Sequence, residues 1–176
     1  MNSDYLTRDQ MVAALERLGA KLQERDIDAS LYVVGGAALA FAFMRDRVTR
    51  DIDAIVAPNQ EVFAAAREVG DELALPEEWL NDTASAFLPE VQLDQGTLVF
   101  EAPGISVRTA PAEVLLAMKI LAGRAKDLDD IRTLAGLLRL TTAQQVWEVF
   151  LSYYPKGDLV DHSRAIVDEL FASSGD

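Results

Sequence analysis

A short apolar run from Leu31 to Val34 ends directly at two glycines, Gly35 and Gly36. An apolar, β-branched run of this length predicts a buried strand, and the glycines predict the turn that stops it. A helix is expected to follow, from Ala37 to about Arg45. Glycines between a strand and a helix let a phosphate group approach the backbone amides at the helix N-terminus. The segment therefore predicts a phosphate-binding turn.

A second strand is expected from Asp51 to Val56, after a spacer of fourteen residues that follows Gly36. Successive side chains of a strand point to opposite faces, so Asp51 and Asp53 share one face while Ile52 anchors the other. At strand rise the two aspartates are roughly 7 Å apart along the backbone, which suits carboxylates that share or bridge divalent cations.

The metal predicted for such a pair is Mg²⁺ or Mn²⁺. The chain has no cysteine and a single histidine, His162, so carboxylates are left as ligands, and carboxylates suit hard cations. Three arginines, Arg45, Arg47 and Arg50, lie in the return segment before the second strand. Arg50 is the one expected to contact a triphosphate, because it lies next to the carboxylate strand.

The charge balance restricts the partners. The chain has 16 Lys and Arg against 29 Asp and Glu, a net charge of -13, which repels a polyphosphate backbone at long range. A small molecule or a protein is therefore favoured as acceptor over a long nucleic acid. No apolar run is long enough to cross a bilayer and the N-terminus lacks the pattern of a secretory signal, so a cytoplasmic protein without membrane contact is expected.

The remaining pattern predicts helices around a small sheet. Apolar spacing and a capping box of Thr7 with Gln10 predict a first helix from Thr7 to Arg25. Further helices are expected at residues 61–73, 111–138, 141–153 with a capping box of Thr141 and Gln144, and 159–171, with a hairpin of strands at 98–101 and 105–109 and a loop at 75–90. This order predicts an α+β or α/β fold with a small mixed sheet. A single domain is expected over residues 1–176, with 1–110 as its sheet-containing core and 111–176 as a helical C-terminal region.

A polar stripe is expected in the C-terminal half. Lys119, Gly123, Asp127 and Asp130 follow one another at intervals of four, four and three, which places them on one face if the helix is unbroken. Arg124 belongs to the same charged segment. A cation and two acids on one stripe either contact a nucleotide or form an internal ion-pair network.

Two blocks of the chain resemble the polymerase-beta-like nucleotidyltransferase superfamily. The first runs from Tyr32 to Ala40 and continues from Arg47 to Asp53, with the pattern of an apolar residue, two glycines, a spacer and Asp-apolar-Asp-apolar. The second, from Met118 to Ile131, is similar to a helix with lysine, arginine and aspartate in the same proteins. The variants that the chain resembles are minimal nucleotidyltransferase-like proteins and abortive-infection-type toxin nucleotidyltransferases.

The resemblance implies a metal-dependent transfer of a nucleoside monophosphate from a triphosphate to a hydroxyl or phosphate acceptor, in a toxin–antitoxin or defence setting. It implies phosphate contacts from Gly35, Gly36 and Lys119, and metal binding by Asp51 and Asp53. Active relatives usually place a third carboxylate on a later strand, but the strand at 105–109 contains no acid. Asp94 and Glu101 remain as sources, and Glu101 is predicted to be catalytic together with Asp51 and Asp53.

The missing third acid keeps a second hypothesis open. The chain is then a catalytically inactive nucleotidyltransferase-like binding module, an antitoxin or regulator that acts through a partner protein or a second copy of itself. A third reading is a helical interaction protein in which the glycines and the acid pair are incidental.

Overall fold

The computed structural model describes residues 5–44, 46–155 and 161–172, which divide into two compact units. The sheet unit comprises Met1–Ala86 and Gln92–Ala110, and the helical unit comprises Phe87–Val91 and Pro111–Asp176. The change at Ala110 falls where the sequence predicts the end of the sheet-containing core. Each unit buries apolar side chains of its own.

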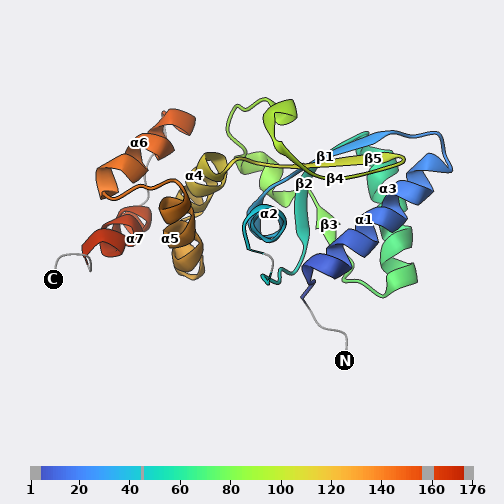
Figure 1. The fold of residues 1–176 in the computed structure, drawn as a ribbon, viewed down its shortest axis with the longest axis horizontal. Coiled ribbons are helices and arrows are strands. Elements are labelled where there is room, and N and C mark those ends of the chain that lie inside the picture. The colour runs from blue at the N-terminus through green and yellow to red at the C-terminus, as the bar shows by residue number, and fades with distance from the viewer. Residues whose placement is uncertain (1–4, 45, 156–160, 173–176) are drawn as a thin grey trace. The chain divides into compact units, whose positions relative to one another are not determined.

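The sheet unit is built on a five-stranded mixed sheet in the order β3-β2-β1-β5-β4 (Figure 1). Its strands are β1 (Ala29–Val33), β2 (Ile52–Ala57), β3 (Leu80–Asn81), β4 (Thr97–Ala102) and β5 (Ile105–Thr109). Strand β1 pairs antiparallel with β2 and parallel with β5, β2 pairs parallel with β3, and β4 and β5 form the predicted hairpin. A mixed sheet with a helical C-terminal half confirms the predicted α+β class.

The two faces of this sheet differ in character. Leu31, Val33, Ile52 and Ala54 are at most 2% exposed and belong to the core. Because side chains alternate along a strand and the register pairs Tyr32 with both Ile55 and Arg108, the other face carries a different set. This second face, called the acid-bearing face here, presents Ser30, Tyr32, Asp53, Ile55, Ser106 and Arg108, with Asp51 just before β2.

Three helices accompany the sheet: α1 (Arg8–Gln23), α2 (Gly35–Ala42) and α3 (Asn59–Leu73). Helices α1 and α3 lie side by side, and Lys21 joins them by ion pairs to Glu68 and Glu72 (Figure 1). The capping box of Thr7 and Gln10 at the start of α1 is present as predicted. The helix predicted at 37–45 begins two residues earlier, because Gly35 adopts the positive φ angle that lets it follow the strand directly.

The helical unit contains α4 (Ala112–Ala122), α5 (Leu128–Leu137), α6 (Ala143–Tyr153) and α7 (Asp161–Ala172). The helices expected over 111–138 are α4 and α5, and they are separate because Gly123 adopts a left-handed conformation that ends α4 and a 3₁₀ turn follows at Ala125–Asp127. The polar stripe is therefore not on one unbroken helix. The capping box of α6 is formed by Thr142 with Gln145, one residue later than predicted. The predicted start of the last helix, residues 159 and 160, lies outside the described residues. Among the described helices none is long and apolar enough to span a membrane.

Candidate functional site

The turn between β1 and α2 is shaped by its two glycines. Gly35 has a φ angle of 65° and is the first residue of α2, and the preceding Val34 supplies no side-chain hydrogen bond to the helix N-terminus. A Cβ atom at Gly36 would lie 2.7 Å from the hydroxyl oxygen of Thr49, so this position is closed to a larger residue unless Thr49 moves. The turn therefore leads directly into a helix start, and the Thr49 side chain packs closely against its second glycine.

The two aspartates lie beside this turn. The amide of Val34 donates a hydrogen bond to the backbone oxygen of Asp53 at 2.9 Å, which brings the ends of the two strands together. A Cβ atom at Gly35 would lie 3.6 Å from Oδ2 of Asp53, so the carboxylate faces the glycine directly. Asp51 and Asp53 are both half-buried, whereas Ile52 between them is fully buried. The alternation predicted from the sequence is therefore the one observed.

Asn81 is a member of this group that the sequence pattern did not reveal. It lies in β3, paired in register with Asp53, and its Nδ2 donates to Oδ2 of Asp51 at 3.2 Å. The hydrogen bond holds the Asp51 carboxylate at one oxygen. A strand of two residues has no periodicity, so the sequence predicts only a loop at 75–90 and does not reveal β3.

The arginines of the return segment take different positions. Arg47 lies near the glycine turn, since a Cβ atom at Gly36 would be 3.9 Å from its Nε. The Arg50 guanidinium lies 5.5 Å from the centre of the Tyr5 ring, and Arg50 is exposed. Arg45 lies outside the described residues. Arg47 is thus the arginine whose position beside the glycines is given directly by the structure.

The sheet does not bring Glu101 to the acid pair. Glu101 is exposed on β4, and the register of the sheet places it level with Ser106 and Ser30, near the start of β1. Asp53 lies at the other end of β1, where its backbone oxygen accepts a hydrogen bond from Val34. Within residues 5–44, 46–155 and 161–172, no group of three or more His, Cys, Asp and Glu side chains is placed to hold a metal ion. On β5 the acid-bearing face presents a cation, Arg108.

In the helical unit the predicted polar stripe forms a buried ion-pair network. The Lys119 ammonium lies 2.7 Å from Asp127 Oδ1 and 2.7 Å from Asp130 Oδ2, and the exposed fractions of the three residues are 6%, 4% and 3%. Arg124, with its side chain half exposed, adds a contact of 2.6 Å from its Nε to Asp127 Oδ2. The charged residues were expected either to contact a nucleotide or to form an internal ion-pair network, and the observed contacts form the network.

The network fixes the ionisation of Asp127. Burial raises the pKa of this carboxyl, but the hydrogen bonds and charges of Lys119 and Arg124 outweigh it, so the pKa lies below its ordinary value. Asp127 is accordingly a carboxylate at neutral pH. A triphosphate that contacted Lys119 would have to take the place of Asp127 and Asp130 around the ammonium.

A mixed sheet with a glycine turn facing an acid pair defines a nucleotidyltransferase-like domain. Comparison with protein families matches residues 10–148 to the family described as "Nucleotidyltransferase of unknown function (DUF6036)". The chain belongs to this family, which confirms the resemblance found in its two sequence blocks. No curated protein and no solved structure matches the chain.

Proposed function

We propose that this protein binds a nucleoside triphosphate at the glycine turn through a divalent cation held by Asp51 and Asp53, and transfers its nucleoside monophosphate to an acceptor. The observation that carries the proposal is the position of the Asp53 carboxylate against Gly35. A Cβ atom added to this glycine would lie 3.6 Å from Asp53 Oδ2. Phosphate contacts at the start of α2 and metal ligands on β2 are thereby adjacent. The family match supports this class of reaction.

The carboxylates suit Mg²⁺ or Mn²⁺, which prefer oxygen ligands and, when bound, would offset the charge of the triphosphate. In the transfer, an acceptor oxygen forms a bond to the α-phosphorus while the bond from that phosphorus to the bridging oxygen breaks. Pyrophosphate leaves, and the acceptor proton is released to solvent. Asn81 donates a hydrogen bond to one oxygen of Asp51 and so fixes the orientation of this carboxylate, which would hold the cation together with Asp53.

The acceptor proposed is a small molecule or a protein side chain, because a net charge of -13 opposes a long nucleic acid. The resemblance to toxin nucleotidyltransferases extends the proposal to a toxin–antitoxin or defence setting in the cytoplasm. Two observations favour the second candidate function, a binding module without turnover. The described residues bring no third carboxylate to Asp51 and Asp53, and β5 presents Arg108 on the same face.

Replacing Asp53 with asparagine is expected to abolish the Mg²⁺-dependent stabilisation of the protein by nucleoside triphosphates. A ligand present at a hundred times its dissociation constant adds about 2.7 kcal/mol to the free energy of unfolding, which a thermal shift assay resolves. Each of the four triphosphates is added with Mg²⁺ to the parent, to Asp51→Asn and to Asp53→Asn. Loss of one carboxylate charge removes a metal ligand, so both variants lose the shift.

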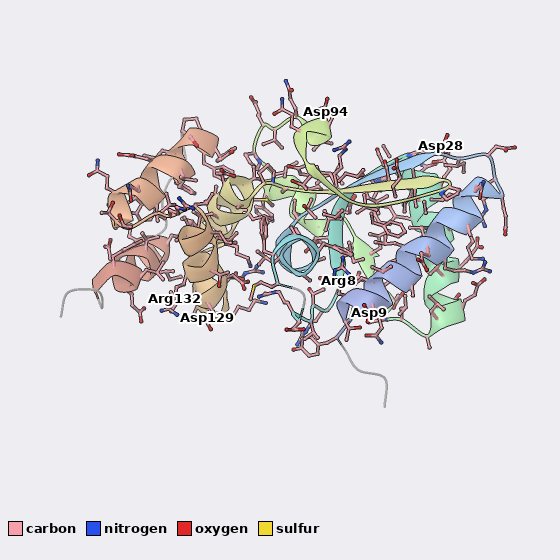
Figure 2. The ribbon with its side chains drawn as sticks, in the orientation of Figure 1. Arg8, Asp9, Asp28, Asp94, Asp129 and Arg132 are labelled. Carbon is pink, nitrogen blue, oxygen red and sulfur yellow. The ribbon has the colours of Figure 1, made fainter. Side chains whose placement is uncertain are left out.

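Asp28→Asn is the matched control, because it removes the same charge from an exposed residue just before β1, away from the end of β1 that bears the glycines (Figure 2). This variant is expected to keep the full shift. A shift that survives in Asp53→Asn, or its absence in the parent with every triphosphate, would contradict the proposed site. Release of pyrophosphate from the parent then separates the transferase from the binding module, since only the transferase turns over.

A further inference from the structure

A cavity of about 290 Å³ opens on the acid-bearing face of the sheet. Strands β1, β2 and β5 contribute its floor, and the 3₁₀ turn at Leu93–Gln95 contributes one wall. Its polar side chains are those of Ser30, Tyr32, Asp94, Ser106 and Arg108. The cavity lies wholly within the sheet unit and has no part in the site described above.

Arg108 is held in this cavity by the wall. Its Nη1 donates to the backbone oxygen of Gly96 at 2.8 Å, and the arginine is half-buried. The wall is packed tightly, because a Cβ atom at Gly96 would lie 2.8 Å from Tyr32 Cε2 and 3.1 Å from Arg108 Cβ. A guanidinium carries five N–H donors, so the bond to Gly96 orients the group and uses one of them.

Two serines on the same face of the sheet line the cavity with this arginine. Ser30 and Ser106 are direct partners in the parallel pairing of β1 with β5, and Arg108 follows Ser106 by two residues on the same face. All three line the cavity. The arginine and the two serines together offer several hydrogen-bond donors to a ligand in the cavity, a set that suits the oxygens of a phosphate.

We propose that this cavity binds the phosphate group of a small phosphorylated molecule, with Arg108 as the charged contact and Ser30 and Ser106 as hydroxyl donors. A half-buried arginine that lines a cavity is the matching charge for such a group in a chain with a net charge of -13. The volume is at the small end of ligand-binding pockets, which favours a small metabolite over a polymer. Asp94, exposed at the turn, adds a negative charge that limits affinity (Figure 2).

The cavity is close to the acid pair along β2. Ile55 lines the cavity and follows Asp53 by two residues on the same face, a separation of roughly 7 Å at strand rise. A phosphorylated molecule anchored by Arg108 is therefore placed beside the proposed transfer site and is its acceptor. The role as acceptor rests on the proposed function, whereas phosphate binding itself does not.

The test is a titration of the whole protein with inorganic phosphate, without metal or nucleotide, followed by NMR of its amide and arginine side-chain signals. Saturable shifts are expected at Ser30, Ser106 and the Arg108 Nε. Arg108→Gln is expected to raise the dissociation constant about tenfold or more, since it removes a charged hydrogen-bond donor. Asp94→Asn is expected to lower it several-fold because a nearby negative charge is lost. The spectrum of each variant shows that it is folded.

Two controls separate this proposal from the proposed function. Arg132→Gln removes a cation from an exposed residue of α5 and is expected to leave phosphate binding unchanged (Figure 2). Asp53→Asn removes the proposed metal ligand, and saturable phosphate binding is expected to remain in this variant because Arg108, Ser30 and Ser106 are intact. Shifts that persist in Arg108→Gln, shifts confined to Gly35 and Gly36, or equal binding of acetate would each overturn the phosphate site.

Discussion

Replacing Lys119 with methionine is expected to lower the free energy of unfolding of the helical unit by about 3–5 kcal/mol. The ammonium lies between Asp127 and Asp130, each at 2.7 Å, and all three residues are buried. Methionine keeps the apolar stem and removes the charge, so two buried carboxylates lose their shared partner. Removing one member of a buried ion pair costs more than the pair contributes as a whole, because the remaining charge is left without compensation.

Chemical denaturation measures the loss in the free energy of unfolding. Hydrogen exchange of the α4 and α5 amides shows whether the loss is located in these helices. Arg132→Met is the matched control, since Arg132 pairs with Asp129 at 2.8 Å but both side chains are more than half exposed. That variant is expected to lose about 0–1 kcal/mol. A loss of that same small size in Lys119→Met would contradict the structural role of Lys119 and would favour a contact of this residue with a ligand instead.

The pH dependence gives the same network a second signature. The pKa of Asp127 is lowered in the folded protein, so its contribution to stability is present above its ordinary pKa and is lost as pH falls through the folded value. In Lys119→Met the Asp127 carboxylate loses the partner that contributes most to lowering its pKa, so it protonates more readily. The difference in stability between the variant and the parent is therefore expected to shrink in acid, as denaturation curves below pH ~4 would show.

The glycine turn and the acid pair could be predicted because each rests on a local pattern. Gly35 needs its positive φ angle, and the alternation of Asp51, Ile52 and Asp53 follows from strand geometry alone. Both patterns span a few adjacent residues, so they can be recognised in the sequence without information about tertiary contacts. The same holds for the capping box of Thr7 and Gln10.

What could not be predicted depends on contacts between distant segments. Asn81 reaches Asp51 across thirty residues from a strand of two residues, which has no period to detect. The sequence pattern around Lys119 is compatible with either a ligand contact or an internal ion-pair network. Only the burial of Asp127 and Asp130 distinguishes the two interpretations. The position of Arg108 on the same face of the sheet as Asp53 required the register of β1 with both β5 and β2.

Replacing Gly104 with alanine is expected to destabilise the sheet unit by about 2–5 kcal/mol. Gly104 has a φ angle of 81°, a conformation that costs other residues roughly 1–2 kcal/mol. A Cβ atom there would lie 2.5 Å from the backbone oxygen of Gly19 and 2.8 Å from the amide nitrogen of Gln23 in α1. Because both are backbone atoms, the helix or the hairpin must move, and overpacking of this kind costs about 1–3 kcal/mol.

Two further glycines separate these causes. Gly35 has a φ angle of 65° but a nearest contact of 3.6 Å, so Gly35→Ala is expected to cost only the conformational part, about 1–2 kcal/mol. Gly136 in α5 has no atom within 4 Å of a built Cβ, and Gly136→Ala is expected to stabilise by about 0.5–1 kcal/mol. Denaturation of the three variants measures the order. Equal losses for Gly104→Ala and Gly35→Ala would show that α1 and the hairpin are not in the backbone contact described.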